Sequence, residues 1–202
     1  GRISDGDAAV YWDFREDSAR QLTQAFVLDT FPHFQRRKIK NLFFVTMTEY
    51  DKLYSAAVAF PSLEVEWPLG RVLSEAARTQ LHIAESEKYA HVTYFFNGGR
   101  EKPFSREERA LIPSRPASEF VAHPEMSAAS ITEAIIKGIS SYDFILANYA
   151  NGDMVGHTGN FAATVKALEV LDGELRRVAD AVRAEGGVLL VTRSKQVCSK
   201  EP

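Results

Sequence analysis

The chain has 202 residues, 45% of them hydrophobic, which suits one domain or parts of two. Its formal net charge of −3 gives no global basic field, so we expect neither nucleic acid nor an anionic membrane as a partner. The single cysteine, Cys198, excludes an intrachain disulfide and, with no membrane-length apolar run and no signal-peptide core, favours a cytoplasmic protein.

The first half of the chain alternates between β-prone runs and helical patterns. AAVYWDF (8–14) predicts a buried strand, and apolar residues spaced three or four apart predict a helix over 17–28. LFFVTMTEY (42–50) again reads as a strand, LGRVLSEAARTQL (69–81) as a helix, and HVTYFF (91–96) as a strand that ends in a glycine turn.

The second half begins with a charged, proline-containing connection over 100–127. SAASITEAIIKGIS (127–140) predicts a helix that begins at a serine cap, and YDFILANY (142–149) predicts a strand. A long helix is expected over 160–184, stopped by a glycine pair, and VLLVT (188–192) reads as a last strand. Because these strands are apolar throughout and alternate with helices, we predict an α/β fold with a mostly parallel sheet and helices on both faces.

Polar side chains follow the strand over 142–149, in the stretch NYANGDMVGHTGN (148–160). Asp153 and His157 are four residues apart, which places them on one face if the chain is helical there. Carboxylate and imidazole are ligands that a manganese- or zinc-like cation accepts, and the carboxyl ends of parallel strands are where sites form. The alternative is a polar turn in which the aspartate caps the next helix and the histidine lies on the surface.

The basic run RRKIK (36–40) stands between a phenylalanine-rich helix end and a strand. We interpret it as a solvated face or an anion-attracting edge rather than a nucleic-acid patch, because the chain as a whole is slightly acidic.

Five segments, in this order, carry a resemblance to a known family. Together they resemble the cofactor-independent (2,3-bisphosphoglycerate-independent) phosphoglycerate mutases of the alkaline-phosphatase superfamily, from about residue 4 to residue 192. The segments are DGDAAVYWDFREDSARQL, FVTMTEYD, AESEKYAHVTYFFNGG, PEMSA and NYANGDMVGHTGN.

The resemblance implies an alkaline-phosphatase-like fold with part of a second α/β lobe. Residues 1–66 would be the C-terminal part of an inserted substrate-clamping phosphotransferase domain, and residues 67–202 part of the metal-binding domain. Family members interconvert 3-phosphoglycerate and 2-phosphoglycerate through a phosphoserine, use two manganese ions, and are typically monomeric. The metals neutralise phosphoryl oxygens and cationic side chains hold the substrate.

Four residues match the family's site by position. Arg15 matches a substrate-binding arginine, and a guanidinium suits a carboxylate or phosphate, although a lone arginine is more often a surface ion pair. Lys88 matches a catalytic lysine near the phosphoryl group, with a solvated lysine as the alternative. Asp153 and His157 match two ligands of one manganese.

Glu87 and His91 are interpreted as outer residues of the same site. At Ser18 the family has a second arginine, for which Arg20 could partly substitute. After the last predicted strand the family has an Asp-His metal-binding pair, whereas this chain has Arg193, Ser194 and Lys195. An ammonium group has no lone pair to offer a metal.

At most one partial manganese site is therefore expected. The family's nucleophilic serine has no counterpart here, so we expect an internal, truncated segment that is inactive as an isolated chain and that self-associates through uncovered edges. The alternatives are a non-catalytic remnant that serves as a binding or interaction module, or has no function, and another metal-dependent phosphatase or phosphomutase of the superfamily.

Overall fold

The computed structural model describes residues 2–61 and 65–192. The chain divides into two compact units, residues 1–64 and residues 65–202, each described here by itself. Among the described residues, no helix combines the length and the apolar composition needed to cross a membrane.

The first unit is a small parallel sheet with one helix. Strand order is β1-β2-β3, with Val10 opposite Val45 and Val45 opposite Ala57. The elements are β1 (Ala8–Tyr11), α1 (Glu16–Val27), β2 (Phe43–Thr46) and β3 (Ala57–Val58). The strand predicted over 8–14 and the helix predicted over 17–28 are present, but β1 is not buried, since Val10 is 61% exposed.

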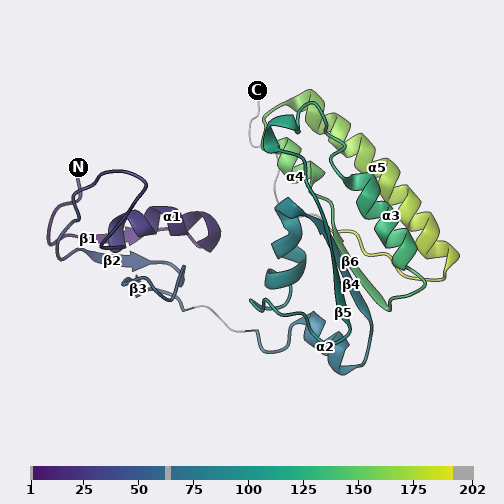
Figure 1. Ribbon diagram of the computed structural model, residues 1–202, viewed down its shortest axis with the longest axis horizontal. Helices are drawn as coiled ribbons and strands as arrows, with labels where there is room; N and C mark the ends of the chain where they lie inside the picture. The colour runs from purple at the N-terminus through teal and green to yellow at the C-terminus, as the bar shows by residue number, and fades with distance from the viewer. Residues whose placement is uncertain (1, 62–64, 193–202) are drawn as a thin grey trace. The chain divides into compact units, whose positions relative to one another are not determined.

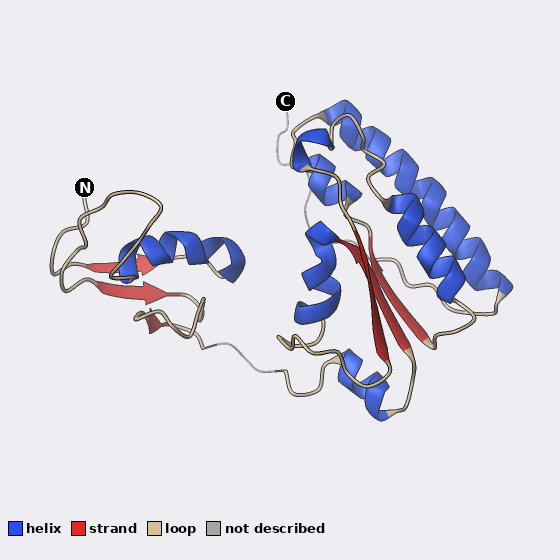
Figure 2. Cartoon of the chain, viewed as in Figure 1, coloured by secondary structure: helices blue, strands red, loops and turns tan. Residues whose placement is uncertain are grey.

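The second unit is a three-stranded parallel sheet in the order β5-β4-β6, with helices on both faces (Figures 1 and 2). The sheet consists of β4 (Gln80–Glu85), β5 (Glu107–Ile112) and β6 (Phe144–Asn148). The helices are α2 (Leu69–Glu75), α3 (Ala128–Gly138), α4 (Asn151–Gly156) and α5 (Phe161–Ala184), with short turns η1 (Ser86–Lys88), η2 (His91–Phe95) and η3 (Ala117–Glu119). The predicted α/β fold with parallel strands is confirmed.

The two faces of β4 pack against different elements because side chains alternate along a strand. Leu81 and Ile83 join one buried cluster with Ile131 and Ile135 of α3 and with Val178 of α5. On the other face, His82 lies edge-on to Phe96, which follows η2. The helical stretch that contains η2 lies across the sheet from α3 and α5 (Figure 1).

Two sequence predictions in this unit are wrong. The helix predicted over 69–81 ends at Glu75, and QLHIAE (80–85) forms the central strand instead. The predicted strand HVTYFF (91–96) is the π-helical turn η2, since the chain turns back over the sheet after β4. There the hydroxyl of Thr93 donates to the carbonyl of Tyr89 at 2.8 Å.

Two further differences concern the sheet edges. The connection expected over 100–127 contains β5, which pairs with β4 along its whole length. VLLVT (188–192) is irregular rather than a strand, with Val188 86% and Leu190 84% exposed. A strand exists only when a neighbour takes up its backbone hydrogen bonds, and within the described ranges nothing pairs with this segment.

Candidate active site

Two neighbouring parallel strands bring the predicted site residues together. β4 and β6 pair in register, with Ala84 opposite Asn148, so their carboxyl ends lie at the same edge of the sheet. Lys88 stands in η1, directly after β4, and Asp153 stands in α4, directly after β6. The fold thus brings together two residues that are 65 positions apart in sequence.

Lys88, Asp153 and His157 form one contiguous polar cluster. The Lys88 ammonium donates to Oδ2 of Asp153. His157, which follows the last residue of α4, places its Nε2 atom 3.2 Å from Oδ1 of the same carboxylate. The side chains of Lys88 and Asp153 are 12% and 17% exposed, whereas His157 is 53% exposed.

The helical spacing predicted for Asp153 and His157 is present in the structure. The amide of His157 donates to the carbonyl of Asp153 at 2.9 Å, which is one helical turn. Both side chains therefore lie on one face of α4 and reach the same point. The alternative of an aspartate that only caps the next helix does not describe this geometry, because Asn160 caps α5 by accepting from the amide of Ala163.

The donor atoms of this pair fit a shared divalent cation. Nitrogen and oxygen ligands at about 2.1 Å from one ion are about 3.0 to 3.4 Å apart in octahedral or tetrahedral geometry. The 3.2 Å between Asp153 Oδ1 and His157 Nε2 falls in that range. Across the parts of the chain that the structure covers, no group of three or more His, Cys, Asp or Glu side chains could hold a metal, so the pair is a partial site.

Of the other predicted residues, Arg15 and Arg20 belong to the first unit, and Glu87 and His91 are close to Lys88 in sequence. Arg15 directly precedes α1 in the first unit, and its amide donates to Oδ1 of Asp13 at 2.8 Å. Arg20 donates from Nε to the carbonyl of Tyr50 at 2.8 Å. Glu87 is exposed, and His91 packs against the ring of Phe95. The segment Arg193, Ser194 and Lys195 lies outside the described residues.

Sequence reasoning missed two buried polar residues beside the cluster. Glu85 ends β4, is fully buried, and accepts the Ser127 amide at 2.9 Å; its burial raises the pKa of the carboxyl. Asn151 is also fully buried and donates 2.8 Å bonds to the carbonyls of Pro124 and Glu125. The signal in the sequence is a polar residue at, or shortly after, the carboxyl end of an apolar strand.

Asn151 also explains why the PEMSA segment accompanies the loop after β6. The side-chain amide of Asn151 fixes the Pro124–Glu125 backbone against α4, and Ser127 in the same segment meets Glu85 of β4. These bonds position α4, which contains Asp153, relative to β4, the strand that leads into η1 and Lys88.

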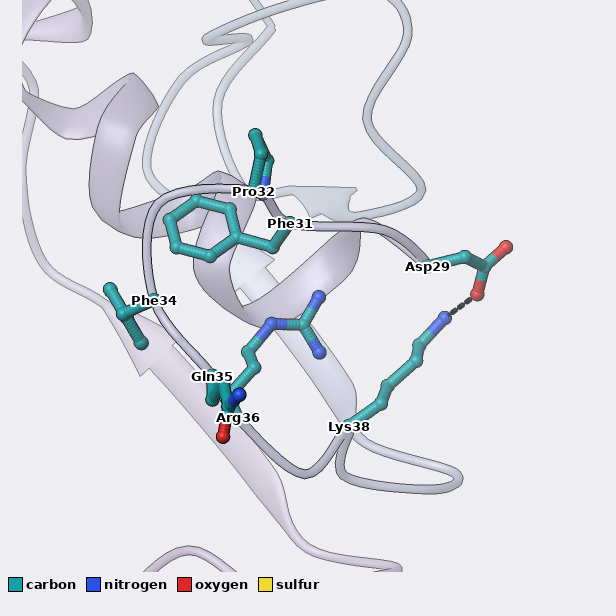
Figure 3. A pocket seen from close by; sticks show the side chains of 7 residues that line it. All are labelled: Asp29, Phe31, Pro32, Phe34, Gln35, Arg36 and Lys38. Atoms are coloured by element: carbon teal, nitrogen blue, oxygen red, sulfur yellow. Dashed lines mark hydrogen bonds and ion pairs between the residues drawn. The ribbon is translucent and has the colours of Figure 1, made fainter.

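A separate pocket of about 540 Å³ lies in the first unit, beside the basic run (Figure 3). Its cations already have partners: Lys38 pairs with Asp29, and Arg36 donates to the carbonyl of Leu28. Arg37 pairs with Asp5 at 2.8 Å. The lining residues are Asp29, Phe31, Pro32, Phe34, Gln35, Arg36 and Lys38. The pairing agrees with the interpretation of this run as a solvated face.

Comparison with known proteins shows to which family the chain belongs. The family model described as the metalloenzyme superfamily matches residues 30–193, and the model of the BPG-independent PGAM N-terminus matches residues 1–52. The chain belongs to the metalloenzyme superfamily.

Within that superfamily the chain corresponds to a segment of 2,3-bisphosphoglycerate-independent phosphoglycerate mutase. It is 48% identical over 192 residues to the protein of that name from Shewanella baltica (strain OS185), covering 94% of this chain and 37% of the relative. The Synechococcus sp. (strain JA-3-3Ab) protein is 51% identical over 193 residues, 95% of this chain and 36% of the relative. The chain spans little over a third of these relatives' length.

A solved structure shows the same relation. The chain is similar to Leishmania mexicana phosphoglycerate mutase, whose crystal structure was determined at low cobalt concentration, with a TM-score of 0.67 and 33% identity. The match covers 93% of this chain and 35% of that chain. It agrees with the α/β fold and parallel sheets described above.

Proposed function

We propose that this chain is part of an enzyme that interconverts 3-phosphoglycerate and 2-phosphoglycerate through a phosphoserine, in the cytoplasm and in glycolysis. The observation that supports the proposal is the meeting of Lys88, Asp153 and His157 at the carboxyl edge of a parallel sheet. Domain roles follow in the proposal: residues 1–66 belong to a substrate-clamping domain and residues 67–202 to a metal-binding domain.

Each residue has a distinct task in this proposal. Asp153 and His157 would hold one manganese ion, and a bound divalent cation supplies charge neutralisation for a phosphoryl group. Lys88 stabilises the phosphoryl oxygens as a positive charge, and Arg15 binds the substrate carboxylate or phosphate through its guanidinium. The low exposure of Lys88 and Asp153 strengthens these electrostatic interactions, because less water screens them.

A graft tests the proposal in a complete protein. Residues 1–192 of this chain replace the matching residues of the Shewanella baltica relative, and interconversion is followed in an assay coupled to enolase with added manganese. We expect the graft to be active and its Lys88→Ala variant to lose at least about a hundredfold in turnover, as for a removed transition-state charge. Lys137→Ala, on the exposed side of α3, is the matched control.

A folded but inactive graft would contradict the proposal. It would favour the alternative, in which this segment is a non-catalytic remnant that serves as a binding or interaction module. Equal activity in the graft and in its Lys88→Ala variant would remove the assigned role of the lysine and leave the rest standing.

The isolated 202-residue chain is expected to show no measurable interconversion, with or without manganese. Two ligands from one helix bind a cation weakly, because water must fill the other positions. We expect weak manganese binding that disappears in Asp153→Ala and in His157→Ala but not in Asp172→Ala, an exposed carboxylate of α5. Turnover above the protein-free rate would contradict this expectation.

A further inference from the structure

One carboxylate, that of Asp153, faces two neighbours of different kinds, an ammonium and an imidazole. Its Oδ2 atom accepts from the Lys88 ammonium, and its Oδ1 atom faces His157 Nε2, the position that the proposed cation would share. The pair is largely buried, with Lys88 12% and Asp153 17% exposed, so water screens it poorly. In this structure the negative charge of Asp153 is already balanced by the lysine.

We infer that Lys88 is an internal counter-ion that opposes metal binding at Asp153 and His157, and that an oxyanion which draws Lys88 away promotes it. This inference rests on the proposed function, because it concerns the same site. It adds a regulatory relation. The metal and the anion bind cooperatively, because Lys88 can pair either with Asp153 or with the anion.

Elementary electrostatics gives the direction of the effect. A divalent cation and an ammonium that share one carboxylate are about 5 Å apart, and their repulsion weakens metal binding by at least about tenfold even with the dielectric constant of water. An oxyanion near Lys88 offsets that repulsion, so it strengthens metal binding. By linkage, the metal then strengthens anion binding by the same factor.

This exchange requires no change of fold. Lys88 stands at the end of the short turn η1, on a flexible four-carbon side chain, whereas Asp153 and His157 are fixed by the backbone of α4. Only the lysine has to move. The carboxylate and the imidazole stay 3.2 Å apart.

Manganese titration of the whole chain tests the inference, with the free ion measured by electron paramagnetic resonance. We expect Lys88→Met, which keeps the side-chain length without the charge, to bind manganese about tenfold more tightly or better than the wild type. Lys88→Arg, which keeps the charge, and Lys137→Met, which removes an exposed lysine, should bind like the wild type.

A second arm adds methyl phosphate as the oxyanion. Manganese affinity should rise with methyl phosphate in the wild type and stay constant in Lys88→Met. If Lys88→Met does not fold, as judged by circular dichroism, Lys88→Gln replaces it, since its amide still donates to Asp153 without a charge.

The outcomes separate this inference from the proposed function. Binding that depends on Asp153 and is equal or weaker in Lys88→Met overturns the counter-ion role while leaving the metal site intact. A methyl phosphate effect of equal size in both proteins overturns the coupling. Absence of manganese binding from every variant overturns both the metal site and the inference.

Discussion

Residue His82 illustrates how a buried ionisable group makes stability depend on pH. It lies in the middle of β4, fully buried, with ring contacts to Phe96 and Phe144. Burial lowers the pKa of its imidazole below the ordinary value of 6.5; the Glu107 carboxylate, 3.6 Å away, raises this pKa in opposition, and the Arg109 guanidinium lowers it further. In the folded protein His82 is therefore neutral at pH 7.

The sign of the pH effect follows from that lowered pKa. The unfolded chain binds a proton on His82 as pH falls through about 6.5 and the folded chain does not, so stability present above this pH is lost below it. We expect the wild type to lose up to about 1.4 kcal/mol of unfolding free energy from this residue between pH 7.5 and 5.5. Urea unfolding at the two pH values measures the loss.

In His82→Phe the pH-dependent loss should shrink, whereas His33→Asn, at an exposed position, should behave like the wild type. Glu107 does not contribute to this pH dependence. Its pKa is lowered from 4.5, so its contribution to the unfolding free energy is lost only at more acidic pH. Equal pH dependence in the wild type and His82→Phe would contradict the assignment.

Asn151 gives a second prediction at this scale. Asn151→Ala removes the only donor that its side chain offers to the carbonyls of Pro124 and Glu125, in a fully buried position. Leaving two acceptors unpaired costs about 2 to 4 kcal/mol. Chemical denaturation should show that loss, and Asn160→Ala, which removes an N-cap, should cost only about 1 kcal/mol. Similar losses for both variants would contradict the argument.

The helices and strands show which parts of the fold are readable from sequence. α1, α3 and α5 were predictable because their apolar residues recur at helical spacing, and β6 because it is a short apolar run between turns. η2 was not, because its residues are β-branched and aromatic and only packing over the sheet makes them helical.

β5 was missed for the opposite reason. EERALI (107–112) carries three charges in six residues, which is atypical of a buried strand, yet it pairs along its length with β4. Its first residue, Glu107, is buried and bonded to Asn97 and Arg109. A local sequence pattern does not reveal a buried strand when the partners of its charged residues come close only in the folded structure.

Two glycines in helices provide a matched test of packing. A methyl group at Gly138 of α3 would lie 3.0 Å from Leu81 Cδ2 and 3.3 Å from Ile145 Cδ1, whereas at Gly173 of α5 nothing lies within 4 Å. We expect Gly138→Ala to destabilise by about 1 to 2 kcal/mol and Gly173→Ala to stabilise by about 0.5 to 1 kcal/mol. Thermal unfolding measures both changes. If both variants are more stable than the wild type, the packing between α3 and the sheet accommodates a methyl group at Gly138, and the prediction is wrong.

At the scale of the whole molecule, uncovered apolar surface is the dominant feature. β5 and β6 are the outer strands of their sheet, and Phe161, Val188 and Leu190 are each more than 80% exposed. Exposed strand edges and large apolar side chains favour association. We expect the isolated chain to self-associate at tens of micromolar, about the range where such surfaces aggregate.

Leu190→Glu should reduce this association, because it places a charge on the exposed segment. Ala129→Glu adds the same charge at an exposed position of α3 without removing a large apolar side chain, and should leave association unchanged. Sedimentation velocity measures both variants. A monomeric wild type at that concentration would refute the prediction.

The candidate site could be predicted from sequence only in part, because one of its contacts is local in sequence and the other is not. Asp153 and His157 are neighbours on one helical turn, so their proximity could be predicted from spacing. The contact between Lys88 and Asp153 depends on β4 and β6 being adjacent, whereas the sequence pattern predicts a helix over 69–81 that overlaps the start of β4 and predicts no strand there. Without the resemblance to a family, nothing local would have joined them.

The register between β4 and β6 has a consequence for how such chains can change over evolution. From the paired residues Ala84 and Asn148, Lys88 lies four positions onward and Asp153 five. One inserted or deleted residue in either interval would rotate a side chain away from its partner, whereas length changes in the exposed stretch at 99–103 would leave both intervals untouched. Among descendants of this segment, gaps should therefore accumulate there and be absent from 84–88 and 148–153.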